Sequence, residues 1–249
     1  MHRWLPVFTF VGALLLWWGV TRLRVFPESA FPGPQAVALG FLEEFRSGRT
    51  VRDIVASLFR VTSGFLLAVF TSLPIGLWLG HHTAGRAALL PAVNFFRNLS
   101  PLAWIPFAIL WFGIGDTPAI FLIFLASFFP LTLSTLAAVA GIPSVYFQVA
   151  RDYGIRGGNV LLRVTLPAIM PQFITALRVT AGVAWMVVVA AEMLAGKDGL
   201  GFAVWDARNG LRTDLLVCQM VVIGVIGVGI DRLLVGLTRL PEVRWGYAR

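Results

Sequence analysis

Charge and cysteine are scarce in this sequence. Charged residues are 13% of the 249 residues, about half the share found in ordinary soluble domains. Cys218 is the only cysteine, which excludes an intrachain disulfide framework and a cysteine metal cluster. No Gly-rich loop ends in Lys-Ser or Lys-Thr, so we expect no ATP site in the chain itself. Histidine and aspartate do not cluster, which argues against a hydrolase or a metal centre.

Long apolar runs are what the sequence has in place of charge. Apolar residues make up 58% of the chain, and the mean hydropathy is +0.82. The runs are continuous, which is typical of membrane-spanning helices. At about 20 residues for each crossing, the length allows five to seven helices with short loops. We therefore predict an all-α, multi-pass membrane protein without a separate soluble domain.

The positions of these runs predict six membrane spans. The first is followed by a stretch rich in proline and charge, in which we expect an amphipathic helix after Pro34. Residues 1–53 thus form a first span with a connecting segment, and residues 54–249 form the core. Prolines interrupt the third run, where they remove helix hydrogen bonds. The expected spans are residues 4–20, 54–80, 87–115, 117–140, 167–195 and 215–237.

Lysine and arginine indicate the orientation only weakly. Basic residues are nearly balanced between the two sides, so the positive-inside rule decides little by itself. Many of those that would lie outside are confined to the one long segment before the second span. We expect both termini in the cytoplasm.

A small residue recurs at every fourth position of the second expected span. Residues at this spacing lie along one helix face and let two helix backbones come close, which is how helices pack in lipid. We interpret this ladder as a packing face; a surface that slides during a transport cycle is the alternative. Its members are Gly64, Ala68, Ser72, Gly76 and Gly80.

The polar segment 141–166 is too long for a simple turn between two spans. Its pattern predicts a short helix over 146–153 that ends at Gly154, then a glycine turn and a second short helix over 160–166. Pro167 opens the next span, where a missing N–H costs little. A helix–turn–helix outside the membrane that displays arginines is suited to bind a soluble partner. An idle amphipathic loop on lipid headgroups is the alternative.

The same segment has a fixed spacing of Gly, Leu and Pro. Gln148-Val149-Ala150 is followed after three residues by Gly154, and after nine more by Val164-Thr165-Leu166-Pro167. This resembles the EAA motif of permease subunits of binding-protein-dependent ABC importers, which reads Glu-Ala-Ala, three residues, Gly, nine residues, Ile-x-Leu-Pro. The spacing matches throughout, and the departures are Gln148 for the Glu and Val149 for the first Ala.

In that family the segment forms coupling helices that sit in a groove of the cytoplasmic ATPase. The resemblance implies the same role for residues 141–166, here called the coupling segment, and places it inside, in agreement with the expected orientation. The residues assigned to ATPase coupling in this way are Gln148, Ala150, Arg151, Asp152, Gly154, Arg156, Val164, Leu166 and Pro167.

The resemblance extends over about residues 58–240 and indicates one branch of the ABC importer permeases. Residues 100–106, 111–115, 189–194 and 199–206 look like the nitrate, sulfonate, taurine and bicarbonate permeases. This implies a type I, MetI-like fold and import of a small oxyanion by alternating access. An ABC importer for another small solute, such as a thiamine-pyrimidine precursor, is one alternative. An ion-coupled secondary transporter is another, but it predicts inverted repeats, and the sequence shows no internal duplication.

The resemblance also implies the partners. They are a second permease copy, expected to be identical, two cytoplasmic ABC ATPase subunits, an extracytoplasmic solute-binding protein and membrane lipid, with no nucleic acid. The chain is then not an enzyme by itself and binds no cofactor, because ATP and Mg belong to the partner ATPase. The expected location is the bacterial cytoplasmic (inner) membrane.

Polar residues inside the spans are candidates for an anion pathway, because an anion needs donors and positive potential to replace its hydration. Arg178, Gly182, Trp185 and Glu192 share one face of the fifth expected span. The face is about 21 Å long at about 1.5 Å per residue, so Arg178 and Glu192 cannot pair. We predict that it lines a central cavity. Alternatively, Arg178 reaches the headgroups and Glu192 holds a structural hydrogen bond.

The broken third span offers further pathway candidates. Arg97, Asn98 and Ser100 precede or flank its proline breaks, and irregular backbone at membrane depth is tolerated where it is buried or lines a cavity. Arg97 can supply positive potential to an oxyanion. It can equally pair with Asp116 or Glu192 of a neighbour, or anchor the start of the span.

Two other regions carry simpler expectations. Arg60, early in the second span, is expected to fix the helix position or to pair with Asp53. The composition of residues 196–214 predicts an outward-facing surface loop. The resemblance implies that this loop is a gate and a contact surface for the binding protein.

Overall fold

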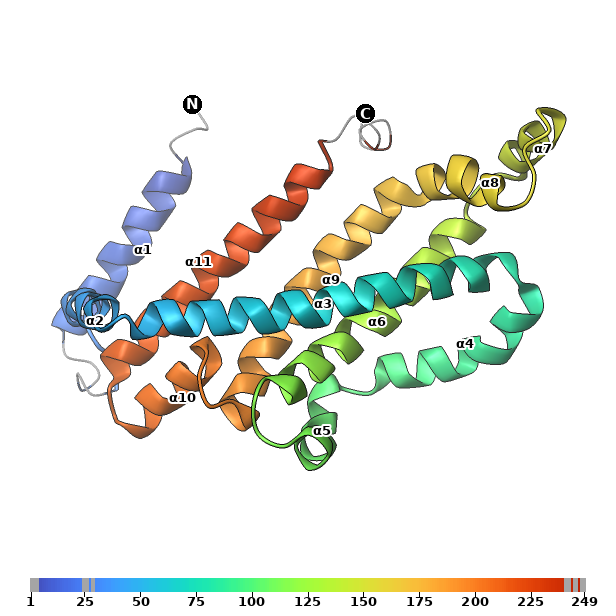
Figure 1. Cartoon of the computed structure of the whole chain (residues 1–249). Coiled ribbons are helices and arrows are strands. Elements are labelled where there is room, and N and C mark those ends of the chain that lie inside the picture. Colours follow the sequence, from blue (N-terminus) through green and yellow to red (C-terminus); the bar gives the residue numbers. More distant parts are fainter. Residues whose placement is uncertain (1–4, 24–26, 28–29, 240–242, 244–245, 247–249) are drawn as a thin grey trace.

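The computed structural model describes residues 5–23, 27, 30–239, 243 and 246 (Figure 1). Over these residues the chain folds into helices, with no strand among them. Trp4, where the first span was expected to begin, lies outside the described residues, as do Arg244 and Arg249 of the tail.

Among the described residues, four helices are long and apolar enough to cross a membrane. They include most of the expected second, fourth, fifth and sixth spans, and α1 (Leu5–Arg22) is a shorter apolar helix at the first. The prediction of an all-α, multi-pass membrane protein is therefore confirmed. The four long helices are α3 (Arg49–His81), α6 (Asp116–Ala140), the helix over 158–195 that includes α9 (Leu166–Ala195), and α11 (Thr213–Leu237).

The third expected span is broken into separate helices. α4 (Thr83–Asn98) ends before Pro101, and a 3₁₀ turn η2 (Pro101–Trp104) leads into α5 (Ile105–Phe112). Ser100 is extended, with φ −60° and ψ 126°, because a residue before proline is driven out of the helical region. The sequence predicted that prolines interrupt the run over 87–115. The helix is broken at one of them, Pro101.

The amphipathic helix α2 (Pro34–Ser47) forms where expected, but several of its apolar side chains are exposed and one of its carboxylates faces the fold. The carboxylate of Glu44 is buried, where it accepts hydrogen bonds from Thr50 at 3.3 Å and from Gln219 at 3.2 Å. The carboxylate is stable on this side because protein groups supply the hydrogen bonds that lipid cannot. The buried residues are Val37, Gly40 and Glu44, and exposed apolar ones are Leu39, Leu42 and Phe45.

The long helices form one inclined bundle. α6 packs against α3 on one side and α9 on the other, and α11 packs against α9 and α2. In Figure 1 the start of α1, the end of α11 and α7 (Ser144–Asp152) lie toward one edge of the molecule. The helices α5 and α10 (Leu200–Asn209) lie toward the opposite edge.

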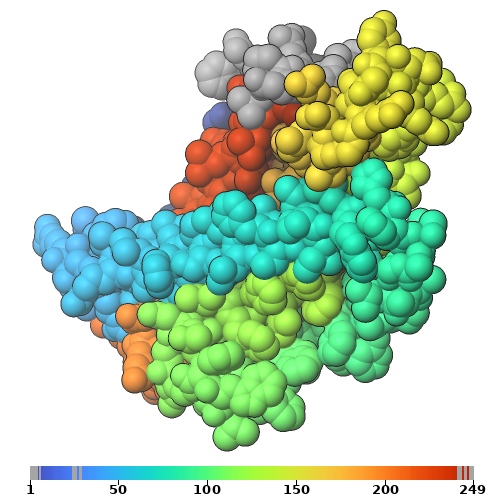
Figure 2. Space-filling model, turned by 45° about the vertical axis from the view of Figure 1, so that its right-hand side comes forward, coloured from blue at the N-terminus to red at the C-terminus, as the bar shows by residue number. Residues whose placement is uncertain are grey.

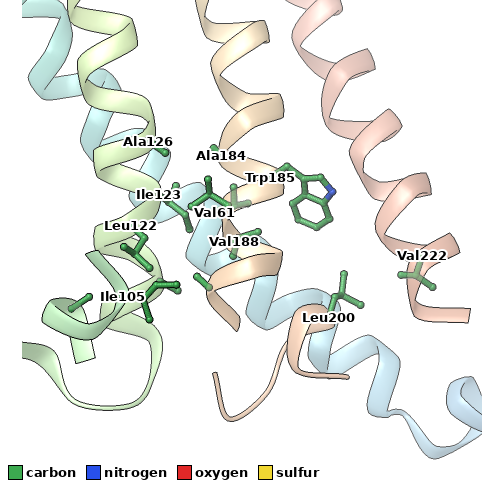
Figure 3. Close-up of a cluster of buried hydrophobic side chains, with 14 residues drawn as sticks. Val61, Ile105, Leu122, Ile123, Ala126, Ala184, Trp185, Val188, Leu200 and Val222 are labelled. Carbon is green, nitrogen blue, oxygen red and sulfur yellow. The ribbon is translucent and has the colours of Figure 1, made fainter. Parts of the chain in front are cut away.

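The apolar core lies nearer the α5 and α10 end. Figure 3 shows side chains from six helices meeting there, α3, α5, α6, α9, α10 and α11. Leu122, Ala184, Val188 and Leu200 are fully buried. The core therefore holds α10 against the long helices, and residues 196–214 are not the plain surface loop that composition predicted.

The small-residue ladder of α3 faces α6. A Cβ placed on Gly76 would lie 2.6 Å from the Cβ of Thr135, and one on Gly80 would lie 2.6 Å from the Cβ of Val139. Real Cβ atoms do not approach so closely, so the two helix backbones meet at these positions. The ladder consists of Gly64, Ala68, Ser72, Gly76 and Gly80, of which Ala68 and Ser72 are fully buried.

Candidate functional site

The coupling segment projects from one end of the bundle, where α7 stands beyond the long helices (Figures 1 and 2). Of the nine residues of α7, only Ala150 is buried. The exposed candidates are Gln148, Arg151, Asp152, Gly154, Arg156 and Pro167, and Val164 and Leu166 are half-buried. An exposed helix that presents Val145 and Val149 as well as polar side chains, with so little burial of its own, is available to a partner.

Gly154 ends α7 in a left-handed conformation, with φ +71°. The N–H of Ile155 donates to the carbonyl of Ala150 at 2.8 Å, and the N–H of Gly154 donates to Arg151 at 2.9 Å. This pair of bonds is the Schellman end of a helix, in which a glycine avoids the Cβ clash of the left-handed region. The first coupling helix therefore ends at Gly154, as predicted, because the backbone there needs a left-handed residue.

The expected second short helix over 160–166 is wrong as a separate element. The chain is helical without interruption over 158–195, and residues Leu161–Thr165 form a π turn within it. Pro167 has no N–H for the carbonyl of Arg163, so the local ladder is rearranged, and Leu166 N–H bonds to Leu161 instead. The C-terminal half of the coupling segment is thus part of the same helix as α9.

Beside α7 lies a groove of about 710 Å³. Its lining is mostly apolar and comes from α7 and the turn after it, the end of α6 and the start of the helix over 158–195. Its polar members are Tyr146, Tyr153, Arg163 and Gln172. His81 at the end of α3 also reaches this region. Its Nε2 lies 3.3 Å from Oγ1 of Thr165. The coupling segment is therefore in contact with α3 as well as α9.

The opposite end of α9 holds an ionic cluster, here called the Arg60 cluster. Its buried members are Asp53, Ser57, Arg60 and Glu192, and its exposed members are Asp116 and Asp198. Arg60 is 2% exposed and Glu192 is fully buried. Arg60 donates to Glu192 at 2.8 Å, to Asp116 at 2.7 Å, and to both the carbonyl and the side chain of Asp198. The expected pairing of Arg60 with Asp53 is wrong, because the guanidinium is satisfied by these three partners.

Serine and backbone groups complete the Arg60 cluster. Ser57 Oγ lies 2.8 Å from both carboxylate oxygens of Glu192 and accepts the N–H of Leu200 at 2.9 Å. Gly201 N–H donates to Glu192, and Gly199 N–H donates to Asp53, each at 2.9 Å. Three consecutive N–H groups at the start of α10 are therefore held by side chains of α3 and α9.

Sequence reasoning missed most of this cluster. Asp53, Ser57 and Arg60 recur at spacings of four and three residues, which places them on one face of α3. A polar stripe in an otherwise apolar helix was a detectable signal. Its partners Asp116 and Asp198 come from distant turns, and nothing in their local sequence indicates Arg60.

The fifth-span face does not form one exposed stripe. Arg178 and Gly182 are exposed, whereas Trp185 and Glu192 are buried inside the protomer. Trp185 Nε1 donates to the carbonyl of Ile223 on α11 at 3.1 Å. Glu192 makes the kind of structural hydrogen bond that was considered as the alternative.

The remaining pathway candidates lie at the surface of the isolated protomer. Arg178 forms an exposed ion pair with Asp231 of α11, at 2.6 and 3.0 Å. Arg97, Asn98 and Ser100 are exposed where α4 gives way to η2. Arg97 borders a pocket of about 150 Å³ with aromatic walls, and no described residue forms a hydrogen bond or ion pair with it.

Exposed charges also surround the start of α11. Arg212 donates to Asp214 at 2.9 Å and to Glu43 of α2 at 2.7 Å. These hydrogen bonds raise the pKa of Arg212, so it stays charged at any physiological pH. The pair with Glu43 ties α2 to the α10–α11 turn.

Comparison with known proteins agrees with this architecture. The family described as "Binding-protein-dependent transport system inner membrane component" matches residues 72–241. A chain of the MetNI methionine ABC transporter, solved in an inward-facing conformation, superposes with a TM-score of 0.62 at 20% identity. The match covers 76% of this chain and 96% of that chain. The expected MetI-like fold is confirmed.

Several transport permeases are similar to this chain over most of its length. The taurine transport system permease protein TauC of Escherichia coli is 35% identical, over 89% of this chain and 82% of that protein. The bicarbonate transport system permease protein CmpB of Synechococcus elongatus is 32% identical, over 94% and 88%. The putative aliphatic sulfonates transport permease protein SsuC of Bacillus subtilis is 30% identical, over 86% and 78%. The match over residues 72–241 and the identity to these permeases show the family. This chain belongs to the binding-protein-dependent transport system inner membrane components, the ABC transporter permeases.

Proposed function

We propose that this chain is the membrane subunit of an ATP-driven importer that works by alternating access. The observation that carries the proposal is the coupling segment, which projects from the bundle and continues directly into α9. A partner that moves α7 therefore also acts on a long membrane helix. Two cytoplasmic ATPase subunits bind ATP and Mg and close on α7, and the permease itself performs no chemistry.

The proposed orientation places the coupling segment in the cytoplasm. The start of α1 and the end of α11 lie toward the same edge of the molecule as α7 (Figure 1), which supports the expectation that both termini are cytoplasmic. The α5 and α10 end then faces outward, where a solute-binding protein docks. The chain would sit in the bacterial inner membrane with a second, identical copy.

For the solute we propose a small oxyanion of the class that the relatives' names include, namely taurine, another sulfonate or bicarbonate. Arg97 supports this class because it is a cation without a partner among the described residues and borders a pocket. Binding of the cognate binding protein to taurine, methanesulfonate, nitrate and bicarbonate, measured by calorimetry, identifies the solute. If none of these binds, the proposed solute class is wrong.

We also propose Arg97, Asn98, Ser100 and Arg178 as pathway residues, because they are polar and exposed on apolar helices. In vesicles that contain the assembled importer, Arg97→Leu should lower uptake of the identified anion at least tenfold. Arg86→Leu, a matched change at the start of α4, should leave uptake unchanged. Normal uptake by assembled Arg97→Leu would remove Arg97 from the pathway.

The coupling role is tested by co-purification with the cognate ATPase. Gly154→Trp places a large side chain on a left-handed residue of the projecting turn, so the ATPase should be lost from the complex. Gly12→Trp, in α1, is the control, because nothing lies within 4 Å of a Cβ at that position. Cross-linking in the membrane determines whether two identical copies are present. Undiminished ATPase recovery with Gly154→Trp contradicts the proposed docking surface.

A further inference from the structure

The Arg60 cluster joins four parts of the chain that are distant in sequence. Ser57 and Arg60 lie on α3, Asp116 begins α6, and Glu192 lies near the end of α9. Asp198 belongs to the turn before α10. A buried guanidinium and a fully buried carboxylate beside lipid are costly to separate, because each would lose its partner where water is excluded.

The start of α10 sits tightly on Glu192. A Cβ on Gly199 would lie 2.5 Å from the Glu192 carboxylate, and one on Gly201 would lie 2.2 Å from the carbonyl oxygen of Val189. Gly199 also has φ +101°, which other residues rarely adopt. Contact this close leaves no space between α10 and the end of α9, so a displacement of Glu192 displaces the start of α10.

The same helix begins in the coupling segment. The chain is helical from residue 158 to residue 195. Leu166 and Glu192 are 26 residues apart, about 39 Å at 1.5 Å per residue. The π turn and Pro167 lie at the coupling end, so the part that leads to Glu192 is ordinary helix apart from Pro171. One helix therefore has the coupling segment at one end and the Arg60 cluster at the other.

We propose that Glu192 and Arg60 are positioning residues that make α10 and the turn before it move together with α9. This inference rests on the proposed ATP-driven function. It adds how a movement that begins at the coupling segment reaches the opposite end of the molecule. The Arg60 cluster passes a movement of the coupling segment to the part of the chain that closes the pathway at the opposite end. A cluster that only stabilises the fold would not create this linkage.

Spin labels at the two ends of the molecule can distinguish the two roles. One nitroxide is attached at Tyr153→Cys, 81% exposed after α7, and another, in a separate protein, at Arg208→Cys, exposed on α10. Both are made in a Cys218→Ser background, in which the serine can still donate to the carbonyl of Val37. The permease is reconstituted with its ATPase, and the spectra are recorded before and after addition of Mg-ATP with vanadate.

In the otherwise unchanged protein both labels should respond to nucleotide. With Glu192→Gln or Arg60→Gln, the Tyr153 label should keep its response, and the response of the Arg208 label should fall at least threefold. Arg60→Lys should recover part of it, because a lysine can still bond Glu192. The matched controls Arg22→Gln and Arg46→Gln change exposed arginines away from the cluster and should leave both responses intact.

The outcomes separate this inference from the proposed function. If the Tyr153 label is silent in the unchanged protein, the proposed coupling to an ATPase fails. If it responds and the Arg208 label does not, or if both respond normally in the Glu192 and Arg60 variants, the linkage is refuted. Ser57→Ala is the milder variant in case those do not fold. If it weakens both labels equally, the cluster has only a stabilising role, and the inference is also refuted.

Discussion

The two ends of the helix over 158–195 are built in opposite ways. At the coupling end the ordering comes from backbone bonds around Gly154, and nearly all of α7 is exposed. At the other end, buried side chains of Arg60 and Glu192 bond across several helices. Segments with little burial open at low free energy, whereas buried networks open only with the whole fold. This difference matches the proposed roles of a surface that binds and releases a partner at one end and a fixed joint at the other.

The sharpest test of this contrast is loss of the buried cation. Arg60→Leu leaves Glu192 without its guanidinium in a dry site, and breaking such a pair costs about 3–5 kcal/mol. The thermal midpoint of the purified protein in detergent should fall strongly. The double variant Arg60→Leu with Glu192→Leu should recover part of the loss, because no buried charge is then left unpaired. A single variant as stable as the parent would show that the Arg60 cluster is not a fixed joint.

Overpacking of the α3–α6 contact should have the next largest effect. At Gly76 a side chain would collide with Thr135, and inserting atoms into a close contact costs about 1–3 kcal/mol. Gly76→Leu should lower the thermal midpoint and the yield of folded protein. Gly224→Leu, where nothing lies within 4 Å, should change neither. Equal stability of the two variants would contradict the close approach of these helices.

A smaller and local effect is expected at the coupling end. Gly154→Ala forces a Cβ into the left-handed region, at a cost of about 1–2 kcal/mol. Because α7 is exposed, the cost should appear as a roughly 5- to 30-fold weaker affinity for the ATPase and not as a lower thermal midpoint. Gly158→Ala begins a helix without a positive φ and is the control. A large drop in midpoint for Gly154→Ala would mean that α7 is part of the stable core.

The smallest change in stability is expected at Arg178. Its ion pair with Asp231 is nearly half exposed on both sides, and exposed pairs contribute little. Arg178→Gln should therefore keep the thermal midpoint, as should Arg232→Gln nearby. Uptake of the identified anion should fall only in Arg178→Gln. Loss of uptake in both variants would indicate a general charge effect and not a pathway residue.

Much of the fold was predictable because membrane helices appear in the sequence as apolar runs of a characteristic length. The runs that became α6, α9 and α11 needed only hydropathy and span length. The end of α7 at Gly154 was predictable because a helix end is a local backbone event. Gly76 and its ladder were recognisable because small residues at every fourth position have one common use beside lipid.

The remainder depends on contacts between distant residues. Arg60 bonds Asp116 and Asp198, which lie 56 and 138 residues away, and no local pattern specifies such partners. The inward side of α2 could not be assigned because Glu44 needs Thr50 and Gln219 from other helices. The second coupling helix was misassigned because Pro167 looks like a helix start but is accommodated within a longer helix by the π turn.

The length of the helix over 158–195 has a consequence for where the proposed ATPase would bind. Thirty-eight residues extend about 57 Å, whereas the hydrocarbon layer is about 30 Å thick. At the usual tilt of about 20° a helix of this length spans about 54 Å, more than the roughly 40–45 Å of a bilayer with its headgroups. In the proposed orientation the coupling segment would extend into the cytoplasm beyond the headgroups, where an ATPase can bind it without contact with lipid.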